Sequence, residues 1–182
     1  MIAKFSSVFP QLLKSGWLRL RCHLWHNCPM TYRCTAIFAK GDATILEAAR
    51  RKWKGCLTRS IDKPFQGVGF ADPGADRCYP LVFNSAQEIE HSLIAKSMKE
   101  ELPVWSEKFS NTVFVFIEAR SFGGVSEYEG FAVNNGHTLC KHSGEDALKN
   151  LVAYLDVTLE EGQSFEPFTR GYFHICRDDR RP

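Results

Sequence analysis

Three side chains in the middle of the sequence have the types and spacing to bind a divalent metal or to act as a general acid and base. They are Glu118, Glu129 and His142. Two carboxylates and one imidazole on neighbouring strands are chemically sufficient for either role. Whether the three side chains meet depends on how the segment from Thr112 to His142 folds.

This segment predicts three consecutive antiparallel strands joined by two tight turns. Asn135 and Gly136 stand between two alternating stretches, and they are the preferred residues for a type I′ turn because both central positions need positive φ. A turn at these two residues predicts a register in which Glu129 faces His142 across the strand pair. The imidazole would then lie on the same sheet face as the carboxylate.

The first of the two turns is expected at Gly123 and Gly124. A two-residue turn at these glycines predicts which residues of the flanking strands face each other. Four charged residues are paired in this way, Arg120 with Glu127 and Glu118 with Glu129. A slip of one residue would move these side chains to the opposite face, so the cluster depends on the length of this turn.

The charged end of the hairpin has two interpretations. Facing carboxylates repel each other, so Glu118 and Glu129 need a counter-charge, a shared proton or a cation, and His142 could supply the positive charge. Alternatively, this end of the sheet runs into solvent with Glu118 exposed. In that case Arg120 and Glu127 form a cross-strand ion pair that contributes less than about 1 kcal/mol.

The rest of the chain predicts an α+β domain in which a largely antiparallel, mixed sheet carries about three helices on one face, as a two-layer sandwich. The evidence is alternation for strands, and capping residues with apolar stripes for helices. Helices are expected from about Ala43 to Lys54, from Ser85 to Pro103, and from Ser143 to about Tyr154. Further strands are expected at Tyr32–Ala39, Cys56–Ile61, Gly67–Ala71, Val157–Leu159 and Gly171–Cys176.

Residues 1–29 differ from the rest because they are basic and contain no Asp or Glu. Three interpretations compete: an extension of the reading frame before a start at Met30, an amphipathic interfacial or targeting helix, and a metal site. The third would use Cys22, His23, His26 and Cys28, although no second ligand pair follows them. From residue 30 to residue 182 the chain predicts a single domain.

Composition and motifs exclude several function classes. A net charge of +2 without a long basic run argues against nucleic acid as a partner. Integral membrane association is not expected, because no run approaches the roughly 18 consecutive apolar residues of a membrane span. The segment Pro64–Pro80 lacks the residues of a phosphate loop, so we expect no cofactor. Seven scattered cysteines without regular spacing favour a reducing, cytoplasmic location.

In the string IEARSFGGVSEYEGFAV an acidic strand continues into Phe-Gly-Gly-Val and then into an apolar strand that ends at a glycine turn. Over Val113–Gly136, about 25 of 182 residues, the chain resembles small uncharacterised bacterial proteins, some of them toxin-neutralising immunity proteins. It departs from their pattern at Ser126 and Tyr128. The resemblance implies a protein partner and no catalytic residue.

The leading expectation is therefore a non-enzymatic, cytoplasmic protein-binding module, immunity-like or a scaffold. The alternative is a small metal-dependent or acid/base enzyme that uses Glu118, Glu129 and His142. The oligomeric state stays open. The candidate binding residues lie around the first turn of the hairpin segment, and they are Arg120, Glu127, Gly123 and Gly124.

Overall fold

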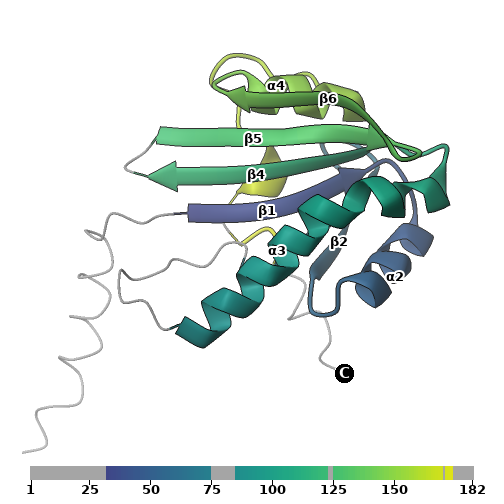
Figure 1. Cartoon of the computed structure of the whole chain (residues 1–182). Helices are drawn as coiled ribbons and strands as arrows, with labels where there is room; N and C mark the ends of the chain where they lie inside the picture. Colours follow the sequence, from purple (N-terminus) through teal and green to yellow (C-terminus); the bar gives the residue numbers. More distant parts are fainter. Residues whose placement is uncertain (1–31, 75–84, 123–124, 170, 174–182) are drawn as a thin grey trace, which may run out of the picture.

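A computed structural model describes residues 32–74, 85–122, 125–169 and 171–173 (Figure 1). The predictions for residues 1–29, for Gly123 and Gly124, and for the end of the last expected strand lie outside these residues. The centre of the fold is a six-stranded sheet in the order β2-β3-β1-β4-β5-β6, with antiparallel neighbours throughout. Its strands are β1 (Tyr32–Ala39), β2 (Leu57–Ile61), β3 (Gly67–Ala71), β4 (Phe114–Phe122), β5 (Val125–Asn134) and β6 (His137–Gly144).

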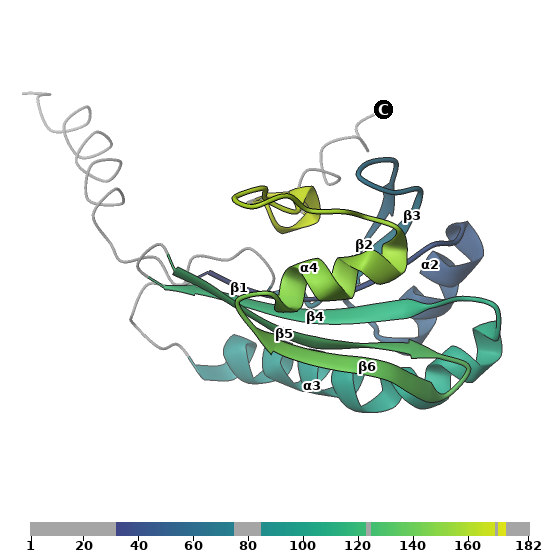
Figure 2. The ribbon, with the colours of Figure 1, turned by 90° about the horizontal axis from the view of Figure 1, so that it is seen from above.

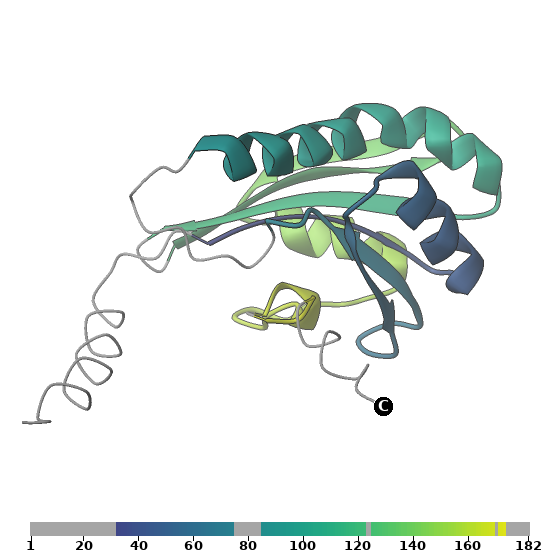
Figure 3. The same ribbon diagram turned by 90° about the horizontal axis from the view of Figure 1, so that it is seen from below.

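The helices are divided between the two faces of this sheet (Figures 2 and 3). Helices α2 (Ala43–Lys52) and α3 (Ser85–Ser106) cover one face, and α4 (Ala147–Val152) lies on the other. The α+β class with a largely antiparallel sheet is confirmed. The sequence analysis, however, expected all three helices on one face of the sheet. Alternation along the central strands is the reason, because Val115 and Ile117 point to the face opposite Phe114 and Phe116 and offer α4 an apolar surface.

Each face has its own core. On the face of α2 and α3, aromatic rings pack around Trp105, and on the other face they pack around Phe38. The first group contains Trp53, Phe70, Phe109 and Phe114, and the second contains Phe65, Phe165, Phe168 and Phe173. The described residues also form short 3-10 helices at Glu107–Phe109, Ala153–Leu155 and Glu166–Phe168.

Several element boundaries differ from the sequence prediction. Helix α2 begins as expected, with the Asp42 carboxylate accepting a hydrogen bond from the Thr44 N–H at 2.8 Å. Helix α3 was predicted to end at Pro103 but continues to Ser106, because burial of Trp105 in the aromatic core holds its last turn in place.

Towards the C-terminus the prediction was less accurate. Ser143 belongs to β6, and α4 begins after Asp146 instead. The stretch Val157–Leu159 is not a strand, although both named side chains are buried, and residues 171–173 form a turn. An apolar, alternating stretch can be buried under a helix without joining the sheet, and sequence periodicity does not separate these two cases.

The Asn135-Gly136 turn is confirmed, with φ of 46° at Asn135 and 79° at Gly136. Its position is fixed by α3, since the Gly136 N–H donates to the Ser106 hydroxyl at 2.9 Å. No helix of the described ranges is long and apolar enough to cross a membrane.

Candidate functional site

The carboxylate of Glu118 is the buried centre of a charged cluster on the sheet face that carries α3. Its side chain is 6% exposed and faces Glu129 across the β4–β5 pair, as predicted. Nη2 of Arg33 donates to Oε1 of Glu118 at 2.9 Å. Arg120 donates to the same oxygen from Nε at 3.1 Å and from Nη2 at 2.7 Å. The ammonium of Lys99 lies 3.8 Å from the other carboxylate oxygen.

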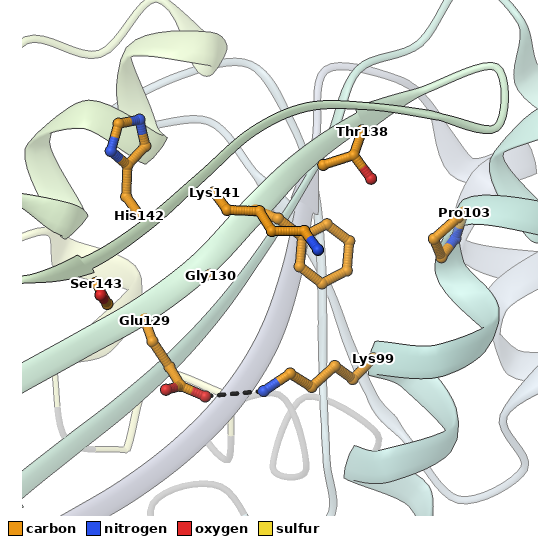
Figure 4. A pocket seen from close by; sticks show the side chains of 9 residues that line it. Lys99, Pro103, Glu129, Gly130, Thr138, Lys141, His142 and Ser143 are labelled. Carbon is orange, nitrogen blue, oxygen red and sulfur yellow. Dashed lines mark hydrogen bonds and ion pairs between the residues drawn. The ribbon is translucent and has the colours of Figure 1, made fainter.

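The second carboxylate of the pair is neutralised from α3. Nζ of Lys99 donates to Oε1 of Glu129 at 2.8 Å (Figure 4). This hydrogen bond is the largest cause that lowers the pKa of Glu129, burial opposes it, and the charges of Lys99 and Arg120 lower the pKa further. The facing carboxylates therefore have their counter-charge, and it comes from arginine and lysine side chains.

His142 does not take part in this cluster, and the predicted pairing of Glu129 with His142 is wrong. The β5–β6 register follows the prediction from the turn to Thr138, and then Leu139 forms a bulge with no partner residue in β5. The shift places Ser143 opposite Glu129 and turns the His142 side chain away from Glu129 and Lys99 (Figure 4).

The cluster has the wrong charges for a divalent metal. Over the part of the chain that the structure describes, no group of three or more His, Cys, Asp or Glu side chains is placed to hold a metal ion. Glu118 already has three cationic groups within 4.0 Å, which would repel a bound divalent cation. The structure thus brings together Glu118 and Glu129, without the third ligand of the enzyme hypothesis.

The predicted ion pair between Arg120 and Glu127 is also replaced. The two residues face each other in the register as expected, but the Arg120 guanidinium turns to Glu118. Its hydrogen bond with Glu118 is the first cause that raises the pKa of Arg120, and Glu127 contributes only through its charge. A buried carboxylate attracts a cation more strongly than an exposed one, because less water screens the pair.

Two members of the cluster, Arg33 and Lys99, were missed by the sequence prediction. Arg33 lies on β1, 85 residues before Glu118, and the antiparallel pairing of β1 with β4 brings them together. The alternation of β1 did place Arg33 on one face, yet no local signal indicates which strand lies beside it. Turn residues indicate only which neighbouring strands pair, so they do not predict a contact between strands this far apart in the sequence.

An open hollow adjoins the cluster between α3 and the last two strands (Figure 4). Its volume is about 390 Å³, and Phe131 contributes an apolar surface. Lys141 is the cross-strand neighbour of Phe131 and is exposed, and it makes no ion pair with any residue that the structure describes. The other lining residues are Lys99, Pro103, Glu129, Gly130, Thr138, His142 and Ser143.

A second hollow of about 510 Å³ continues towards the first turn of the hairpin segment and shares Glu129 and Ser143 with the first. It also contains Glu127, Val125 and Arg120. We call the surface formed by both hollows the open face. Figure 1 shows α3 crossing in front of β1, so that much of β4, β5 and β6 is uncovered on that side.

Acid is expected to weaken the fold partly through Glu129. A carboxyl whose pKa is lowered by folding stabilises the protein above its unfolded pKa, and this contribution is lost as the pH falls through the lower, folded pKa. The Glu129→Gln variant should therefore lose less stability than wild type between about pH 5 and pH 3. Because the side chain is 41% exposed, the difference should stay below about 1 kcal/mol.

Urea unfolding at a series of pH values measures this effect. The matched control is Glu127→Gln, a carboxylate on the same strand without a hydrogen bond to Lys99. If Glu129→Gln and wild type kept parallel stability curves down to pH 3, Lys99 would not stabilise the ionised Glu129.

Comparison with protein-family models, with curated proteins and with solved structures finds no match for this chain.

Proposed function

We propose that this chain is a non-enzymatic protein-binding module whose partner docks on the open face. The observation that carries the proposal is the pair of adjoining hollows, which combine the apolar surface of Phe131 with charged groups at Lys141, Glu127 and Arg120. Protein interfaces typically have an apolar centre surrounded by a polar rim. On the open face, charged side chains of three neighbouring strands surround the small accessible part of Phe131, which is 8% exposed, and the exposed side chain of Val125.

The state of the carboxylate pair supports binding over acid/base chemistry. A general base works best when its pKa lies near the operating pH. The hydrogen bond from Lys99 instead lowers the pKa of Glu129, and Arg33 and Arg120 donate to Oε1 of Glu118. The enzyme alternative also requires His142 beside these carboxylates. In the β5–β6 register, however, the His142 side chain lies on the opposite face of the sheet.

The biological setting is part of the same proposal. The resemblance of Val113–Gly136 to immunity-type proteins supports a bacterial chain that neutralises or scaffolds another protein. The cysteines that the structure describes at positions 56 and 140 are thiols without a disulfide, and burial raises the pKa of Cys56 to about 11. A protonated, unreactive thiol such as that of Cys56 suits a reducing cytoplasm.

Affinity capture from the source organism tests this proposal through a pair of matched variants. Ser143→Trp places a large, uncharged side chain where the two hollows meet, and Ser60→Trp makes the same change on the exposed surface of β2. We expect wild type and Ser60→Trp to capture the same stoichiometric partner, and Ser143→Trp to capture at least about tenfold less. Retention of that partner by Ser143→Trp at the wild-type level would contradict docking on the open face.

A further inference from the structure

Among the strands that the structure describes, β6 forms one edge of the sheet and pairs with β5 alone. Figure 1 shows it as the uppermost strand of the sheet, above β5. Six of its eight residues are exposed. The N–H and C=O groups on the outer side of an edge strand are available to an added strand.

The charge of both sheet edges opposes pairing with a second copy of this chain. Strand β6 carries one charged residue, Lys141, and β2 at the other edge carries one, Arg59; neither strand contains an acidic residue. Pairing β6 with β6, or β6 with β2, would therefore bring basic strands together, and like charges on facing strands destabilise a sheet. The bulge at Leu139 makes self-association less favourable still.

Lys141 gives this edge a preference for acidic side chains. Its ammonium lies on the open face next to Phe131, and the structure places no carboxylate of the described residues in an ion pair with it. The nearby acid Glu129 is already bonded to Lys99 at 2.8 Å. A carboxylate on a strand added to β6 could approach Lys141 from the side that β5 does not occupy.

We propose that β6 is the docking edge for an extended, acidic segment of the protein partner. The segment adds as a strand beyond β6, and side chains on one of its faces lie along the open face with a carboxylate opposite Lys141. Main-chain hydrogen bonds supply the attachment, and Lys141 supplies selectivity because the same charge repels basic edges. This inference rests on the proposed function and names the chemistry of the partner.

Peptides of the length of β6, 8 residues, test the inference on the full chain. The first peptide alternates glutamate with valine and has blocked ends, and the second replaces each glutamate with lysine. A third has the sequence of the first, with alternate backbone nitrogens methylated so that they cannot donate hydrogen bonds. Binding is followed by amide chemical shifts and by amide hydrogen exchange.

We expect the glutamate peptide to shift and protect amides of residues 137–144, and the lysine and methylated peptides to bind about fivefold more weakly or worse. The Lys141→Glu variant should reverse the preference between the glutamate and lysine peptides. The control Lys54→Glu changes an exposed lysine in the turn after α2 and should keep the wild-type preference.

Absence of binding by the glutamate peptide, shifts that leave the amides of β6 unchanged, or equal binding of the glutamate and methylated peptides would overturn strand addition. Equal binding of the glutamate and lysine peptides would overturn the role of Lys141. If strand addition fails while Ser143→Trp still prevents capture of the natural partner, the proposed function stands without this docking mode. If Ser143→Trp also leaves capture unchanged, both proposals fail.

Discussion

Replacing Trp105 with alanine is expected to lower the free energy of unfolding by about 4 kcal/mol. The side chain is 4% exposed and joins α3 to the rest of its core. Its ring centroid lies 5.0 Å from Trp53, 4.9 Å from Phe109 and 5.2 Å from Phe114. Removing the indole leaves a cavity among rings that cannot move together to fill it.

The same change should disturb the open face, because Trp105 anchors the helix that carries Lys99 and Pro103. Urea unfolding followed by circular dichroism measures the loss of stability. The control is Val104→Ala, whose side chain is 68% exposed and whose removal should change stability by less than about 0.5 kcal/mol. Equal effects of the two variants would mean that Trp105 does not hold the last turn of α3.

Replacing Glu118 with alanine should lower the free energy of unfolding by about 2 kcal/mol. Loss of this buried carboxylate leaves Arg33, Arg120 and Lys99 close together without their shared counter-charge. The cost stays below that of a fully buried ion pair because the three cations are about half exposed and regain water. Denaturant unfolding of Glu118→Ala and Glu127→Ala at matched pH measures the effect, and the second variant should lie within about 0.5 kcal/mol of wild type.

Two further comparisons separate charge from shape at this position. Glu118→Gln keeps the volume of the side chain and removes its charge, so it should lose nearly as much stability as Glu118→Ala. Added salt should reduce the deficit of Glu118→Gln by screening the repulsion among the cations. If Glu118→Gln matched wild type, the ionised carboxylate would not be what holds the cluster together.

The β4–β5 hairpin could be predicted because its determinants are local. The strand pairing from Phe114–Val133 to Phe122–Val125 has the expected register. Two-residue turns and alternation act over neighbouring residues, so a single sequence contains the information needed. The pairing of Glu118 with Glu129 could be predicted for the same reason, because it follows from this register.

The register of β6 could not be predicted because tertiary packing determines it. Without the bulge at Leu139, Lys141 would point to the core beneath α4, and Cys140 would lie on the open face. The observed register puts Cys140 against that core and leaves Lys141 in solvent. No glycine or proline marks the bulge. The prediction therefore continued the register of the turn past Leu139 without a shift, and it placed His142 on the wrong face of the sheet.

The division of the helices has the same origin. Alternation along β4 makes both of its faces apolar at Phe114–Ile117, which indicates a strand covered on both sides. A periodic sequence does not say which helix covers which side. The counter-charges of Glu118 were missed for a related reason, since Arg33 and Lys99 reach it only through the packing of β1 and α3 on β4.

Amide hydrogen exchange of the chain, free and bound to the partner that wild type captures, tests the central claim most directly. We predict that binding slows exchange in residues 125–144, the strands β5 and β6 of the open face. Exchange in β2 and in α4 should change little. Protection concentrated in α4 or in β2, with β5 and β6 unchanged, would contradict docking on the open face.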